Sequence, residues 1–201
     1  MPLSSARAAV GAVIALSVLT LVGCAAPASD GARAPESPSP TATVSEPPST
    51  PVTETALSDE VDGTVVTPLA IVTDLPAAEP PAEGLRAVLV KVRLEAGDAY
   101  DGQVFPSVVS ITRRDADLDY VTLGLSNPDT LVSPMSAAGY PPLTAVSPGE
   151  TATAWIGAWL DDELTEFDLV YDRREGTIIG GPDNGEKVPA VRHIVPLTPE
   201  G

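Results

Sequence analysis

The chain has one cysteine, Cys24, and one histidine, His193, so the side chains that most often carry covalent or metal chemistry are scarce. A Ser-His-Asp site needs its serine on a sharp turn, and the sequence has no G-x-S-x-G pattern. One imidazole and one thiol cannot complete the ligand set of an ordinary zinc or copper site, nor can one thiol form a disulfide. We therefore predict no catalytic residue, no metal and no cofactor, and we expect that the protein is not an enzyme.

Three acidic residues have a spacing that could bind calcium. Asp115, Asp117 and Asp119 match the D-x-D-x-D opening of a calcium loop. Such a loop needs glycine at its sixth position and glutamate at its twelfth, where this chain has Tyr120 and Ser126. We interpret the acids as a solvated hairpin turn. A small-ligand or divalent-cation site in acidic loops is the alternative function, and a hydrolase with an unrecognised carboxylate pair is a remote one.

The charge balance bears on possible partners. The chain carries 28 acidic and 11 basic side chains, a net charge of −17. Such a surface repels nucleic acid and anionic lipid. Gly180-Gly181 lies in a loop rich in Pro and Asp, which favours a turn over a phosphate-binding loop. We therefore predict no nucleic-acid partner.

The first 23 residues have the organisation of a signal peptide. Arg7 ends a short positive region, and Ala8 to Val22 form a mainly apolar stretch of fifteen residues. This is shorter than the about 20 residues that span a bilayer as a helix, so a cleaved signal is favoured over a stable anchor.

The run Leu21-Val22-Gly23-Cys24 that ends this segment resembles the lipobox of bacterial lipoproteins. The resemblance implies that residues 1–23 form the signal peptide and that Cys24 carries a diacylglyceryl group. It places the protein on the extracytoplasmic face of the cell membrane, anchored by lipid. Two acyl chains anchor a protein stably, whereas one is reversible.

Residues 24–56 are predicted to form a disordered stalk. From Ala25 to Ala56 the chain has seven prolines and ten Ser or Thr, but only Val44 and Val52 as large apolar residues. Such a segment cannot bury enough apolar surface to offset its ordering entropy. Residues 57–201 remain as one domain of 145 residues, with a net charge of −15.

Short apolar runs bounded by Pro, Gly or Asp indicate that this domain is built of strands. From Leu85 to Glu95, for example, the residues Val88, Val90 and Val92 alternate with others. We predict an all-β fold, an immunoglobulin-like antiparallel β-sandwich of about seven strands, with a closed barrel as the alternative. The predicted strands cover residues 64–73, 85–95, 104–112, 118–125, 151–160, 166–172 and 192–197.

Three details of the sheets can also be predicted. Residues 151–160 have apolar groups on both faces, so we expect this strand to be central. Pro68 should place the first strand at an edge or at a bulge. Asp115-Ala116-Asp117 separates two predicted strands and is typical of a hairpin turn.

Three runs in this domain have the order found in a known family. They are Gly84 to Leu94, Ser147-Pro148-Gly149-Glu150-Thr151, and Phe167 to Tyr171. Their order over residues 62–197 resembles the telokin-like, immunoglobulin-like domain of bacterial envelope lipoproteins, a family of unknown function. The resemblance implies a sandwich and supplies no catalytic residues. The chain departs from the family pattern at residues 95–98 and at Ala154.

Two long connections, residues 126–146 and 172–191, stand between the predicted strands. In the first, Leu131, Met135 and Tyr140 either pack back onto the sandwich or form an interaction surface for a partner protein. Trp155 and Trp159 share one face of their strand, which favours the core. We expect a non-enzymatic envelope lipoprotein whose partners are the membrane, through its lipid, and an unknown envelope protein.

Overall fold

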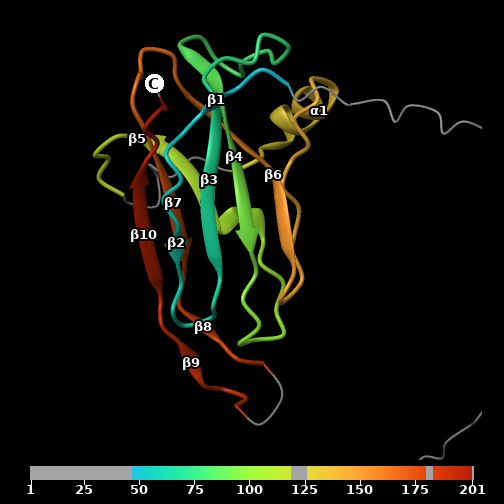
Figure 1. The fold of residues 1–201 in the computed structure, drawn as a ribbon, viewed down its shortest axis with the longest axis vertical. Helices are drawn as coiled ribbons and strands as arrows, with labels where there is room; N and C mark the ends of the chain where they lie inside the picture. The colour runs from blue at the N-terminus through green and yellow to red at the C-terminus, as the bar shows by residue number, and fades with distance from the viewer. Residues whose placement is uncertain (1–46, 119–125, 180–182, 201) are drawn as a thin grey trace, which may run out of the picture. The chain divides into compact units, whose positions relative to one another are not determined.

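The computed structural model describes residues 47–118, 126–179 and 183–200 (Figure 1). All of them lie in the second of two compact units into which the chain divides, residues 44–201. The described part is an all-β domain of antiparallel sheets with one α-helix, as the sequence predicts. No helix among these residues is long and apolar enough to cross a bilayer.

The first sheet has the order β1-β3-β4-β6, and β2 also pairs with β3. The alternating run predicted at residues 85–95 forms β4, which pairs with β6 along its whole length. The register between β3 and β4 shifts between Pro68 and Ala70, which confirms the predicted irregularity at Pro68. The strands are β1 Thr50–Pro51, β2 Leu57–Ser58, β3 Val65–Val72, β4 Leu85–Glu95 and β6 Thr151–Asp161.

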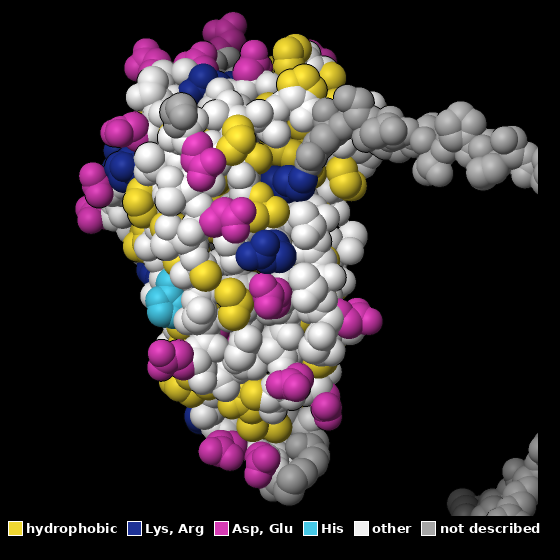
Figure 2. Space-filling model, viewed as in Figure 1, with side chains coloured by type: hydrophobic (Ala, Val, Ile, Leu, Met, Phe, Trp, Pro, Cys, Tyr) yellow, Lys and Arg dark blue, Asp and Glu magenta, His cyan; other side chains and the backbone are white. Residues whose placement is uncertain are grey.

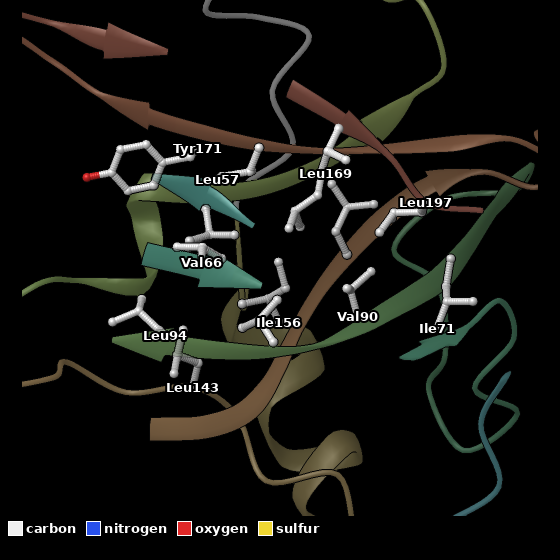
Figure 3. Packing of buried hydrophobic residues seen from close by; sticks show 14 of the residues in the cluster. Leu57, Val66, Ile71, Val90, Leu94, Leu143, Ile156, Leu169, Tyr171 and Leu197 are labelled. Atoms are coloured by element: carbon white, nitrogen blue, oxygen red, sulfur yellow. The ribbon is translucent and has the colours of Figure 1, made fainter. Parts of the chain in front are cut away.

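The second sheet has the order β10-β7-β5. Its strands are β5 Val109–Arg113, β7 Phe167–Arg173 and β10 Val191–Pro196, and the 3-10 helix Pro106–Val108 precedes β5. Five of the seven predicted strands thus coincide closely with strands of the structure. The prediction for residues 104–112 is right only in its second half, because Pro106–Val108 form the 3-10 helix, and most of residues 118–125 lie outside the described ranges. The apolar faces of both sheets form one core, in which Val90 and Ile156 of the first sheet lie with Leu169 of the second (Figure 3).

The strand β6 is not central, contrary to the prediction. It stands last in the order of the described strands of its sheet. Both of its faces are nevertheless buried, because Ile156 faces the core between the sheets and Trp155 faces a second cluster under the helix α1, Asp129–Ala137. Two apolar faces therefore reflect a helix that covers the sheet. On the side of β6 away from β4, the described residues form only an isolated parallel bridge between Trp155 and Pro142.

Asn127 satisfies backbone groups of β6 in the place of a strand. Its side-chain Oδ1 accepts a hydrogen bond from the Gly157 N–H at 2.7 Å, and its Nδ2 donates to the carbonyls of Leu143 and Trp155 at 3.2 and 3.3 Å. Its φ of 51° lies in the left-handed region, which asparagine tolerates better than most residues. Together with main-chain hydrogen bonds of Asn127, Pro141 and Leu143, this side chain makes contacts that a neighbouring strand would otherwise make.

The end of the predicted stalk belongs to the folded unit, which corrects the boundary at residue 56. Thr50 and Pro51 pair with β3, and Val52 is buried in the main core. The C-terminal residues hold the same segment, since Thr53 N–H donates to Thr198 and Glu200 N–H donates to Pro51. One buried valine and backbone pairing are enough to order a segment whose composition favours disorder. Residues 24–46 of the predicted stalk lie outside the described ranges.

Both long connections contain secondary structure. The first carries α1. The second contains a short hairpin of β8, Gly176–Thr177, and β9, Lys187–Val188, at one end of the domain (Figure 1).

Candidate functional site

A groove with a volume of about 780 Å³ lies at the end of the domain that carries the β8–β9 hairpin. Two parts of the lining are called its walls below: the segment 99–105 with the following 3-10 helix, and β8 with Ile178 and Ile179. Its floor includes Tyr171 and Arg173 from the end of β7. The groove is thus built from three parts of the chain that the two sheets bring together.

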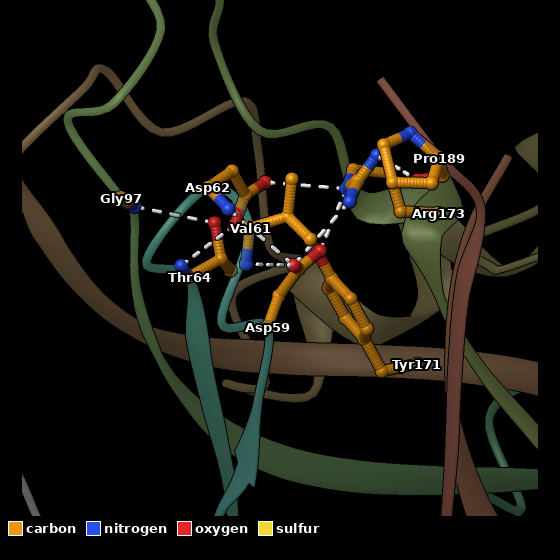
Figure 4. A network of polar contacts seen from close by, with 8 residues as sticks. All are labelled: Asp59, Val61, Asp62, Thr64, Gly97, Tyr171, Arg173 and Pro189. Carbon is orange, nitrogen blue, oxygen red and sulfur yellow. Dashed lines mark hydrogen bonds and ion pairs between the residues drawn. The ribbon is translucent and has the colours of Figure 1, made fainter. Parts of the chain in front are cut away.

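A buried carboxylate holds the floor of the groove in place (Figure 4). The Asp59 side chain is fully buried, and its Oδ2 accepts hydrogen bonds from Arg173 Nε at 2.6 Å and from the Tyr171 hydroxyl at 3.0 Å. Arg173 Nε also lies 3.5 Å from Asp62 Oδ2, and its Nη1 donates to the Pro189 carbonyl at 2.9 Å. Arg173 therefore ties the turn before β3 to the segment before β10.

The turn that carries Asp59 and Asp62 is fixed by local hydrogen bonds. Asp59 Oδ1 accepts from the Val61 N–H at 2.9 Å, as in an Asx turn, and Asp62 Oδ1 accepts from the Thr64 N–H at 2.7 Å. Gly97 packs against the same turn so closely that a Cβ there would lie 1.8 Å from the Asp62 carbonyl oxygen. The two carboxylates consequently have few positions open to them.

The network changes the pKa values of its members so that Asp59 and Arg173 both stay charged. Burial raises the pKa of Asp59, but hydrogen bonds from Arg173, the Val61 amide and Tyr171 outweigh it, so this pKa lies below its ordinary 3.8. Burial, followed by the Asp62 and Asp59 charges, raises the pKa of the Tyr171 hydroxyl well above its ordinary 10.0. The hydrogen bond to Asp59 raises the pKa of Arg173. At neutral pH the floor is an ion pair with a neutral phenol beside it.

The walls of the groove carry exposed apolar side chains. Phe105 is 56% exposed and Ile179 is 93% exposed, and both line the groove together with Tyr100, Val104 and Ile178. Folding normally leaves few large apolar side chains so open, and a cluster of them marks an interaction surface more often than a single one does. The arrangement offers apolar contact to a ligand or partner.

The residues that the sequence suggested as an interaction surface are buried, which corrects that suggestion. Leu131 and Met135 are 0% exposed, and Tyr140 is 6% exposed. All three pack with Trp155 in the cluster between α1 and the first sheet, where the Tyr140 and Trp155 rings meet edge to face at 4.9 Å. The alternative, that they pack back onto the sandwich, is the one that the structure shows.

The other candidate residues of the sequence analysis lie outside the groove or outside the described residues. His193 stacks on Tyr171, with ring centres 6.4 Å apart. Asp115 forms part of a turn with a φ of 54°, and Asp119 lies outside the described residues, as does Cys24. Within the described ranges, no group of three or more His, Cys, Asp or Glu side chains could hold a metal ion.

Sequence reasoning did not identify the groove. Phe105 falls within a predicted strand, and Ile179 falls in the long connection 172–191, for which we predict no hairpin from the sequence. A weak signal is present: Gly176 and Gly185 flank the apolar pair Ile178-Ile179, a pattern that also fits a hairpin with an apolar tip.

Comparison with known proteins finds no matching family model, no matching curated protein and no matching solved structure. The likeness to telokin-like domains therefore rests on the three sequence runs described above.

Proposed function

We propose that the protein is a non-enzymatic lipoprotein, anchored by Cys24 on the outer face of the cell membrane, whose immunoglobulin-like domain binds a protein of the cell envelope in its groove. Two facing sheets around one core support the immunoglobulin-like assignment. The lipobox-like run before Cys24 supports the anchor.

The position of the groove carries the proposal. Pro47, the first described residue, lies against Gly139 beside α1, and Figure 1 shows this region at the opposite end from β8 and β9. Ile71 of β3 pairs with Thr50, near the first described residue. Val65 begins β3, next to the groove floor, and lies six residues before Ile71. That separation is about 20 Å along a strand. A chain attached through its N-terminus would thus present the groove on the side remote from the attachment.

The anchor has a direct test. Cys24→Ala should leave the precursor uncut and without acyl groups, because no other thiol is present in the sequence. Mass spectrometry of the protein extracted from membranes measures both effects. An unchanged mature mass in the variant would contradict the lipid assignment.

The groove is tested by cross-linking in intact cells. A photoreactive amino acid at Phe105 should form covalent adducts with one or a few envelope proteins, because this side chain lies in the groove wall. The same group at Ile194, which is 49% exposed on β10 and outside the groove, is the matched control. Equal adduct patterns at both positions would count against a binding groove.

A further inference from the structure

We infer that the groove takes an extended peptide segment that is positively charged and carries an apolar side chain, supplied by another protein. The inference rests on the proposed function and adds the chemistry of the partner.

The first step is the apolar space. A Cβ added at Gly176 would meet none of the described heavy atoms within 4 Å, so the wall formed by β8 is open at this point. Phe105 and Tyr100 line the other wall, and Ile179 extends the β8 wall. An apolar side chain of a partner in this groove would contact lining side chains such as Phe105 and remove their apolar surface from water.

The second step is the backbone edge of β8. Ile178 uses both of its main-chain groups toward the β9 side, because its N–H donates to Glu186 and its carbonyl accepts from Gly185. Main-chain groups alternate in direction along an antiparallel strand, so the N–H and C=O of Thr177 point away from β9. Thr177 lines the groove. An extended peptide could therefore add to β8 as a further strand, a common mode of peptide recognition.

The third step is charge. The groove is lined by three acidic residues, Asp62, Asp101 and Asp183, and by two basic ones, Arg173 and Arg174. Arg173 is paired with Asp59 and Asp62. Outside that ion pair the lining has the acids Asp101 and Asp183 and the base Arg174, in a chain whose net charge is −17. Acidic side chains also outnumber basic ones on the face shown in Figure 2, down to the end where β8 and β9 lie. Positive charges on either side of the apolar residue of a peptide would complement Asp101 and Asp183.

The same charge disfavours two other occupants. A second copy of the chain would bring another net charge of −17 to the groove. An anionic membrane surface would be repelled for the same reason. A cationic segment with an apolar side chain suits both features of the groove: the apolar residue contacts the walls, and the positive charges lie near the acidic residues of the lining.

The test uses the full-length protein in non-ionic detergent and two fluorescent pentapeptides, Lys-Val-Phe-Val-Lys and Glu-Val-Phe-Val-Glu. Fluorescence anisotropy should show binding of the first peptide only, weakened by salt. Gly176→Phe should abolish binding by filling the groove, whereas Ile194→Ser should leave it unchanged. Asp101→Lys with Asp183→Lys should weaken it about tenfold or more at low salt. Hydrogen exchange at the Thr177 N–H should slow when the lysine peptide binds.

Several outcomes would overturn the inference. They are equal binding of the two peptides, absence of lysine-peptide binding at millimolar concentration, and binding that Gly176→Phe leaves intact in a folded protein. A concentration-dependent dimer that Gly176→Phe dissociates would assign the groove to a second copy. If the Phe105 cross-link maps to an acidic or uncharged segment, the proposed function stands and the inferred chemistry falls. If the lysine peptide binds but Phe105 captures no envelope protein, the proposed function falls instead.

Discussion

We expect the Asp59–Arg173 ion pair to stabilise the folded domain more than most of its other polar contacts do. Asp59→Ala would remove the acceptor of hydrogen bonds from Arg173, Tyr171 and the Val61 amide, and leave a guanidinium that is 16% exposed without its main partner. Breaking a buried pair from one side costs about 3–5 kcal/mol of unfolding free energy. Asp62 and the Pro189 carbonyl still reach Arg173, so we expect the lower end, about 3 kcal/mol.

Urea unfolding of the unlipidated chain from residue 25 onward measures this cost. A change of about 3 kcal/mol corresponds to a fall in Tm of about 6–12 °C for a domain of this size. Glu175→Ala is the matched control, because the side chains of Glu175 and its partner Lys187 are 64% and 67% exposed. An exposed pair contributes about 0–1 kcal/mol, so this variant should differ little from the wild type.

The pH dependence gives a second and independent check. The pKa of Asp59 is depressed on folding, so its contribution is present above the unfolded pKa and is lost as the pH falls through the folded one. The stability gap between the wild type and Asp59→Ala should be constant from pH 7 to about 5 and narrow below 3.8. A gap under about 1 kcal/mol at pH 7, or one that is unchanged at acid pH, would refute the reasoning.

Four further outcomes follow from the structure. Asn127→Ala should cost about 2–3 kcal/mol in urea unfolding through three lost hydrogen bonds, and Asn127→Gly, which tolerates the positive φ, should cost less. Gly157→Ala should cost about 1–3 kcal/mol, since its Cβ would lie 2.8 Å from Met135 Sδ. Val52→Ala should cost about 1–2 kcal/mol, whereas a disordered position would show no change. Stability should fall as the pH rises above 10.0, because the folded state keeps Tyr171 neutral while the unfolded chain ionises it; calorimetry at pH 9 and 11 compares the two.

The strands could be predicted because the alternation of apolar and polar residues is a local pattern. The site could not be predicted, since it depends on contacts between residues far apart in the sequence. The alternation from Leu85 to Glu95 identifies β4 without any knowledge of its neighbours. The partnership of Asp59 with Arg173 joins residues 114 positions apart, and nothing in the spacing of either points to the other.

The errors have physical causes as well. Met135 lies in a segment rich in proline, which suggested a loop, yet the helix begins directly after Pro128 and continues through Pro134. Val52 seemed too isolated to order its segment, but it fills a place in a core built by other strands. In both instances tertiary packing outweighed local composition.

The way the chain enters the domain has a mechanical consequence. A pull on Pro47 would first load the hydrogen bond from the Tyr140 hydroxyl to the Pro48 carbonyl, and then the pairing of Thr50 and Pro51 with β3. The last residues of the chain brace the same segment through Glu200. Tension is thus shared between the N-terminal and C-terminal segments. Removal of the last residues by an exopeptidase would leave residues 50–53 with fewer hydrogen bonds to hold them in place.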